Sequence, residues 1–289
     1  MKITFLGTSA GESYPAIWCD CENCTYARVH GGRNIRMNTG TLIDNDILLD
    51  MNSCGFYTAA RLGVSLTGVR ALLATHSHPD HLTIEPLDWR AGVDDGMEMP
   101  DSQRMSIVSA RFTPLPMMTV YGNHFVKEKL TKCEPVLFDE RHRMRFEEIH
   151  EGVRTEAEGF AFTPLRAQHG PYGFAHSYIL EKGGRTLLYA LDTGGYDADM
   201  MDILLSCRYG GVVMEGTFGL STAEMDAHMN RAKNVRFRER LLKQGCISPD
   251  TPFFLTHMTP HWTPPHDIYA PMMAKEGFTV AYDGMVAEI

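Results

Sequence analysis

The stretch at residues 75–82, THSHPDHL, places three histidines and one aspartate within eight positions. It directly follows an apolar run that is typical of a short strand. Because side chains alternate along a strand, His76 and His78 can point the same way. The proline after them turns the chain, so that Asp80 and His81 reach a second position beside the first. Imidazole and carboxylate groups bind zinc and related ions, and the stretch therefore predicts two adjacent metal ions, one at each pair.

Three further candidate ligands stand where predicted strands end. His169 closes an apolar run at 160–169, and Asp192 and His257 close two later runs. A single histidine at a strand end is more often structural than functional. The three together repeat one pattern, in which an apolar strand is followed by a ligand and then by a glycine or proline turn. We therefore expect them to meet the 75–82 stretch at one rim of a sheet sandwich.

Length and composition exclude several classes of protein. The chain has 289 residues and is 44% hydrophobic, which is enough for one large domain or two small ones. Its net charge of −9 makes nucleic acid and anionic lipid unfavourable partners, although a local basic or metal-bearing cleft could override this field. The N-terminal segment lacks the apolar region of a signal peptide, and no apolar run approaches the roughly 18 residues that span a bilayer. We expect a cytoplasmic protein without a membrane partner.

Strands come first along the chain and are then mixed with helices, which favours a layered α/β sandwich. The pair Gly183 and Gly184 predicts a hairpin turn. The last predicted helix, at 222–245, has Ser221 and Thr222 ahead of Glu224 as a candidate N-terminal cap and ends at Gly245. Strands are predicted at 2–7, 41–51, 69–76, 119–123, 160–169, 176–193, 211–216, 252–257 and 278–284, and helices at 21–30, 197–207 and 222–245.

The segment 91–118 differs in composition from the rest of the chain. It contains five methionines, several acidic residues and three prolines. One interpretation is a surface excursion. The alternative is a lid or a dimer contact, because methionine adapts to irregular surfaces.

Three of the seven cysteines lie within six residues, Cys19, Cys21 and Cys24. An odd, clustered set does not suit a disulfide framework and indicates a metal site instead, with ordinary buried thiols as the alternative.

The seven candidate ligands resemble those of metallo-β-lactamase fold hydrolases, which carry H-x-H-x-D-H after one strand and His, Asp and His after later strands. The resemblance implies a four-layer αββα sandwich. Asp50 matches an aspartate that lies behind the ligands in that family. The implied cofactors are two divalent ions, Zn or Mn, with Fe or Ni also accepted by such ligands. The implied ligands are His76, His78 and His169 for one ion and Asp80, His81 and His257 for the other, with Asp192 bridging.

The N-terminal stretches GTSAGESYP and WCDCENCTYAR narrow this resemblance to the PhnP-like phosphodiesterases of the carbon–phosphorus lyase pathway. That family carries a structural zinc on three cysteines and one histidine. The cysteines match Cys19, Cys21 and Cys24, and His261 is the candidate histidine. His261 follows His257 by four residues, where the family spacing is three.

The resemblance also implies residues that would act on substrate. His228 matches a further active-site histidine, with a capped surface position on a helix as the alternative. Arg33 and Arg36 could hold an anionic substrate, because guanidinium groups match phosphate oxygens, although unpaired surface arginines are equally consistent. Asp80 and His228 are the expected catalytic residues.

The resemblance covers nearly the whole chain, which implies one domain at 1–289 with an insertion at about 91–118. The expected reaction is hydrolysis of a small phosphodiester, cyclic in the implied case, by a hydroxide that the two metals activate. His228 would protonate the leaving group. A homodimer is compatible with the sequence.

The sequence is also consistent with other functions. A lactonase or thioesterase could use the same ligands, because one fold serves several ester classes. A PqqB-like accessory protein of pyrroloquinoline quinone biosynthesis, or another metal-binding protein without activity, would turn over no ester. The intact H-x-H-x-D-H favours hydrolysis over the PqqB-like alternative. A tRNA 3′-processing endonuclease should have a basic arm for RNA, which this acidic chain lacks.

Overall fold

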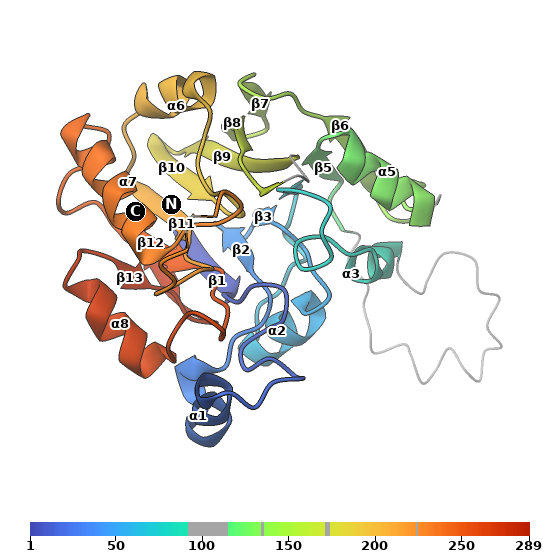
Figure 1. The fold of residues 1–289 in the computed structure, drawn as a ribbon. Helices are drawn as coiled ribbons and strands as arrows, with labels where there is room; N and C mark the ends of the chain where they lie inside the picture. The colour runs from blue at the N-terminus through green and yellow to red at the C-terminus, as the bar shows by residue number, and fades with distance from the viewer. Residues whose placement is uncertain (92–114, 134–135, 171–173, 224) are drawn as a thin grey trace.

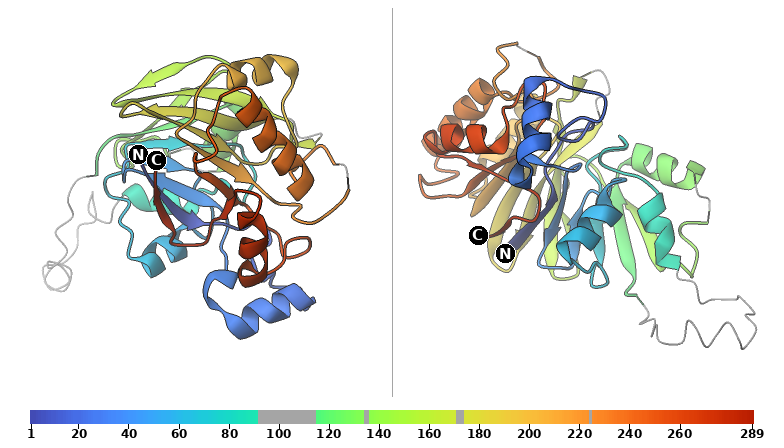
Figure 2. Two further views of the ribbon diagram at one scale, coloured as in Figure 1. Left: turned by 90° about the vertical axis from the view of Figure 1, so that its left-hand side faces the viewer. Right: turned by 90° about the horizontal axis from the view of Figure 1, so that it is seen from below.

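The computed structural model describes residues 1–91, 115–133, 136–170, 174–223 and 225–289. Within these residues, two seven-stranded sheets pack face to face, and helices cover the outer face of each sheet. Figure 1 shows α6, α7 and α8 on one side and α2, α3 and α5 on the other, and the right-hand view of Figure 2 shows the layers edge-on. The predicted four-layer αββα sandwich is confirmed.

The first sheet has the order β14-β1-β2-β3-β4-β5-β6, and the second has the order β13-β12-β11-β10-β9-β8-β7. The strands are β1 Lys2–Gly7, β2 Gly40–Ile43, β3 Ile47–Leu49, β4 Ala71–Leu73, β5 Met118–Gly122, β6 Met144–Glu148, β7 Thr155–Ala157, β8 Phe160–Ala167, β9 Ala175–Lys182, β10 Arg185–Ala190, β11 Gly211–Glu215, β12 Phe253–Thr256, β13 Thr279–Val280 and β14 Val286–Glu288. The helices are α1 Glu22–His30, α2 Gly55–Leu62, α3 Glu85–Asp88, α5 His124–Cys133, α6 Ala198–Leu205, α7 Arg231–Lys243 and α8 His266–Ala274, with short 3-10 turns η1 Gly32–Asn34 and η2 Trp89–Ala91.

Apolar side chains on both faces of the strands build three cores. In β4, Ala71 and Leu73 face the core between the sheets, whereas Leu72 faces the core beneath α2 and α5. In β12, Phe254 faces the other sheet and Phe253 faces the helices of its own side. This alternation follows from the two-residue period of a strand. It explains why the central strands carry apolar side chains on both faces.

The direction of the strands brings the chemistry to one edge. Strands β10, β11 and β12 are parallel, and β8 runs the same way because β9 is antiparallel to both β8 and β10. In the other sheet, β3 and β4 are parallel. The residues that follow these strands therefore emerge at a common rim. The predicted turn between β9 and β10 is confirmed, with positive φ at Gly183 (57°) and Gly184 (71°).

One predicted helix differs from the structure, and the predicted insertion lies mostly outside the described residues. The helix predicted at 222–245 is shorter, because α7 begins only after Asn230, whose side chain accepts a hydrogen bond from the Lys233 backbone N–H. The N-terminal cap expected at Ser221 and Thr222 is therefore wrong. Most of the segment 91–118 lies outside the described residues, and its role stays a prediction. Among the described residues, no helix combines the length and the apolar character that crossing a membrane requires.

Candidate metal centre

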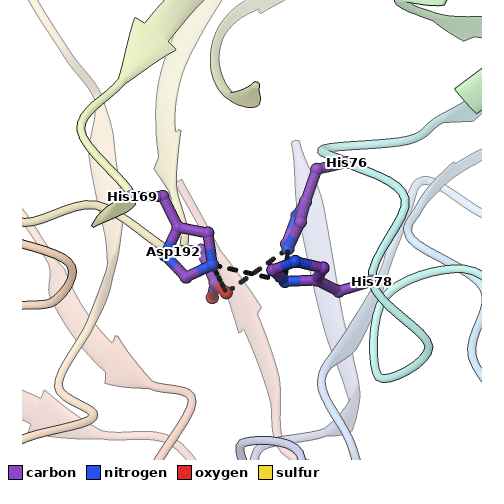
Figure 3. A group of neighbouring side chains, drawn as sticks. All are labelled: His76, His78, His169 and Asp192. Atoms are coloured by element: carbon purple, nitrogen blue, oxygen red, sulfur yellow. Dashed lines mark hydrogen bonds and ion pairs between the residues drawn. The ribbon is translucent and has the colours of Figure 1, made fainter. Parts of the chain in front are cut away.

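The first cluster of ligand atoms joins residues from three strand ends. His76 and His78 follow β4, His169 follows β8 and Asp192 follows β10. Figure 3 shows the three imidazoles and the carboxylate converging on one point. His76 Nε2 lies 2.9 Å from His78 Nδ1, and His169 Nε2 lies 3.3 Å from the same atom. Asp192 Oδ2 lies 3.5 Å from His76 Nε2 and 3.3 Å from His169 Nε2.

The second cluster shares Asp192 with the first. Asp192 Oδ1 lies 3.2 Å from His81 Nε2 and 3.1 Å from His257 Nε2. Asp80 Oδ2 lies 3.5 Å from His81 Nε2 and 3.6 Å from His257 Nε2. The two oxygens of Asp192 therefore face different clusters, as a bridging carboxylate would. All seven side chains that the sequence indicated as ligands are brought together here.

The spacing and chemistry of these atoms fit divalent cations. Four ligands at about 2.0–2.1 Å from a tetrahedral ion are separated from one another by roughly 3.3–3.4 Å, close to the distances found. Buried Asp192 Oδ1 has no hydrogen-bond partner in the described structure, so a cation would satisfy it. Burial opposes the charged form of His81, yet Asp192, Asp80 and Asp50 together hold its pKa well above the usual range. The clusters are thus rich in negative charge that two cations would neutralise.

Two of the ligands, Asp192 and His257, and the supporting residue Asp50 share an unusual backbone conformation. Asp50, Asp192 and His257 each follow the end of a strand and have positive φ angles of 63°, 43° and 60°. Non-glycine residues seldom adopt this region, in which Asn, Asp and His are the most frequent, and such residues cluster at functional sites. The reversal at each strand end lets the side chain turn toward the space between the two sheets.

Hydrogen bonds behind the ligands fix the rings. Asp50 Oδ2 accepts from His81 Nδ1 at 2.7 Å, and Asp50 Oδ1 accepts from the Thr75 backbone N–H at 2.7 Å. His169 Nδ1 donates to the Ala227 carbonyl at 3.1 Å, which leaves Nε2 for the cluster. Such partners determine which ring nitrogen can bind a metal. Asp50 thus occupies the position that the sequence indicated for it.

Lys129 of α5 holds the metal-ligand turn from behind, a role that the sequence did not reveal. Its Nζ donates to the Ser77 carbonyl at 2.7 Å and to the Leu82 carbonyl at 2.6 Å. These carbonyls lie on either side of the turn that carries His78, Asp80 and His81. The ammonium group therefore clamps both ends of the turn. A lysine on an amphipathic helix gives no such signal in sequence, because the turn lies 47 and 52 residues away along the chain.

His228 lies beside the second cluster, on the loop before α7 and not on a helix. Its ring centroid is 4.8 Å from that of His169 and 6.0 Å from that of His257. The loop can lie here because Gly194 has no side chain. A Cβ at Gly194 would lie 1.8 Å from the Asp226 carbonyl oxygen.

The partner of His228 is Glu215, a residue that was not predicted from the sequence. Glu215 Oε1 accepts from His228 Nδ1 at 2.7 Å, and this fully buried carboxylate also accepts from the backbone N–H groups of Thr193 and Thr217. Burial opposes the charge on His228, but Glu215 outweighs it and raises the pKa of His228 to about 9. The available signal was a glutamate at the end of the apolar strand 211–215.

The cysteine cluster forms a separate site. The sulfurs of Cys19, Cys21 and Cys24 lie within 4.8 Å of one another, at the start of α1. Burial raises the pKa of the Cys24 thiol to about 12, so a cation would be needed to hold it as a thiolate. His261 does not join the sulfurs within that distance and lies 40% exposed, 4.0 Å from Glu12. The donor set therefore suits zinc, with the fourth position undefined in the described residues.

The two arginines expected to bind substrate behave differently. Arg36 is fully buried, and its guanidinium donates to the Thr8 hydroxyl and the Ala281 carbonyl and contacts His266 Nδ1 at 3.0 Å. Its assignment to substrate is wrong, because these buried partners already occupy the group. Arg33 is exposed and lies over the ring of Tyr282, 4.1 Å from the ring centroid.

Comparisons with known proteins agree with this geometry. The model of the β-lactamase superfamily domain matches residues 52–241, which include six of the seven ligands. The chain belongs to the metallo-β-lactamase superfamily. This superfamily scaffold is that of metal-dependent hydrolases, and the His and Asp clusters of the chain suit divalent metals. None of the curated proteins matches the sequence.

Solved structures share the fold over the full chain. A diphosphatase of the PhnP family superposes with a TM-score of 0.72 at 19% identity, covering 100% of this chain and 98% of that one. Zinc-bound PqqB from Methylobacterium extorquens gives 0.71 at 17% identity, with both chains covered completely. The short form of human tRNase Z gives 0.64 at 15% identity, covering 100% and 99%. At these identities the likeness concerns the fold alone.

Proposed function

We propose that the protein is a phosphodiesterase that hydrolyses a small phosphodiester at a dinuclear metal centre. The observation that carries the proposal is the carboxylate of Asp192, whose two oxygens face two complete His and Asp clusters. Two cations held this way supply Lewis-acid stabilisation of a phosphoryl group and lower the pKa of water that they bind. The likeness to a PhnP-family diphosphatase supports phosphorus as the centre attacked.

The side chains of the protein would divide the remaining tasks. One cation would be held by His76, His78 and His169, and the other by Asp80, His81 and His257, with Asp192 shared. His228 would donate a proton to the leaving oxygen from Nε2, because Nδ1 is engaged by Glu215. Glu215 would keep the ring in one orientation and stabilise its charged form.

Other assignments of this scaffold fit less well. A tRNA-processing role is disfavoured by the net charge of −9, because RNA binding depends on neutralising phosphates. A purely accessory role would leave the Glu215–His228 pair without a purpose. Lactone or thioester hydrolysis uses the same cations and is distinguished by experiment.

The test is a substrate panel on protein loaded with Mn²⁺ or Zn²⁺. It compares bis(p-nitrophenyl) phosphate, a cyclic and a linear aliphatic phosphodiester, a lactone and a thioester. We expect turnover of the phosphodiesters that disappears after treatment with a chelator. Activity confined to the lactone or thioester would contradict the proposal, and no turnover at all would favour the accessory role.

A further inference from the structure

A row of aromatic rings leads from the metal-ligand cluster to the surface. His257 stacks with His228 at a centroid distance of 6.0 Å, and His228 contacts Phe218 at 5.1 Å. Phe218 in turn packs edge-on against Trp262 at 4.8 Å. Phe218 is buried, whereas Trp262 is 43% exposed. The row therefore begins at a metal ligand and ends in an accessible indole.

Trp262 is exposed but held in place by its backbone. Its carbonyl accepts from the Leu220 N–H at 2.8 Å, which ties it to the loop after β11. Gly219 makes this approach possible, because a Cβ there would lie 2.4 Å from the Trp262 carbonyl oxygen. On the other side, Asn23 of α1 donates to the Pro260 carbonyl at 2.8 Å. The loop is thus joined both to the His228 side of the site and to the helix that carries Cys24.

The Trp262 indole is accessible, and its contact with Phe218 limits its rotamers, so it would lose little conformational entropy on stacking. The exposed side chain of Leu220, whose backbone N–H is bonded to the Trp262 carbonyl, is apolar, which favours a ring over a charged group. His228 lies between the metal ligands and Trp262 along this row, so Trp262 lies on the His228 side of the metal centre.

We propose that Trp262 is a substrate-binding residue that stacks against a planar aromatic ring, such as a nucleobase, carried by the leaving group. This inference rests on the proposed function, because it takes the His228 side of the metal centre as the leaving-group side. The substrate class is then a phosphodiester of an aromatic-bearing alcohol, and an aliphatic leaving group gains nothing from the platform.

The experiment compares two phosphate monoesters that differ only by a planar base, adenosine 5′-monophosphate and ribose 5-phosphate. Their dissociation constants are measured by calorimetry on the metal-loaded protein. We expect the adenosine compound to bind about tenfold more tightly, since stacking of one base on an aromatic side chain has an effect of this order. Trp262→Ala should remove this preference, whereas Trp262→Phe should keep most of it. The matched control is Trp89→Ala, which removes another exposed tryptophan and should leave the ratio unchanged.

Equal affinity of the two monoesters for the wild type, or an unchanged ratio in Trp262→Ala, would overturn the inference. Hydrolysis of bis(p-nitrophenyl) phosphate, measured on the same samples, separates this from failure of the proposed function. Cleavage of this diester without a preference for the adenosine compound refutes the stacking role of Trp262 alone. Absence of both cleavage and monoester binding refutes the proposed phosphodiesterase activity and the stacking role of Trp262 together.

Discussion

The His and Asp clusters and the cysteine cluster are two candidate metal sites built in opposite ways. The first collects side chains from four strand ends across two sheets, and its members are mostly buried. The second draws three sulfurs from six consecutive residues on a loop and the start of α1, and Cys21 is exposed. The first set is held by the whole fold, whereas the second is local and depends on a partner from elsewhere to be complete.

This contrast predicts different consequences of damage. Loss of a rim ligand should act on the reaction, because the sheets that carry the rim persist without it. Loss of a cysteine should act on stability, because a zinc ion held by these sulfurs would stabilise the local fold and take no part in the reaction.

The largest effect on turnover is expected for Asp192→Asn, which removes the charge shared by both clusters. Changes of residues that only orient metal ligands already cost about 10–100-fold, so loss of the bridge should cost more. Turnover and metal content, measured by elemental analysis, should both fall. Asp250→Asn, an exposed turn position, is the control. Full metal content and normal rate in Asp192→Asn would exclude a shared carboxylate.

The next largest effect is expected for His228→Ala, which should lower kcat by about 10²–10⁴-fold while both metals remain bound. Glu215→Gln should lower it by about 10–100-fold, because the imidazole loses its charged partner. The double variant should be no slower than His228→Ala alone, since the two act as a unit. Glu239→Gln on the exposed face of α7 is the control. Loss of metal in His228→Ala would instead make His228 a ligand.

A moderate effect is expected for Lys129→Met, which removes the clamp on the Ser77 and Leu82 carbonyls. Metal affinity, measured by competition with a chelator, should weaken by about 10–100-fold. Lys132→Met is the matched control, because Lys132 is exposed and contacts only Glu128 at 3.8 Å among the ion pairs of the described residues. Unchanged affinity in Lys129→Met would show that the turn needs no support from α5.

The smallest effect on turnover, within about threefold, is expected for Cys21→Ser, because a closed structural site does no chemistry. Its melting temperature should fall by about 5–10 °C, which corresponds to losing a few kcal/mol in a chain of this size. Cys207→Ser, outside the cluster, should change neither property. Lost activity with an unchanged melting temperature would reverse the distinction between the two sites.

The ligands at the rim could be predicted from the sequence because the same pattern recurs at each strand end. Each apolar strand is followed by a His or Asp ligand and then by a turn, and the common direction of the strands brings these ends together. The hairpin at Gly183 and Gly184 was predictable for a similar reason, since paired glycines adopt positive φ without strain.

The errors arose where tertiary contacts override local pattern. The sequence predicts a helix from 222 onward, but Gly194 and the pairing of His228 with Glu215 hold residues 225–230 across the site as a loop. Arg36 looked like a surface arginine, because its partners Ala281 and His266 come from the far end of the chain. The positions of Lys129 and Trp262 depend in the same way on loops that meet only in the folded molecule.

The left-handed backbone at Asp50, Asp192 and His257 has a thermodynamic consequence. Such positions cost about 1–3 kcal/mol each, and all three lie along the edge where the cations would bind. Ion binding can offset that cost, so metal loading and local folding of this edge are coupled equilibria. Gradual chelation should therefore accelerate amide hydrogen exchange after β3, β10 and β12 at concentrations that leave the strand centres protected.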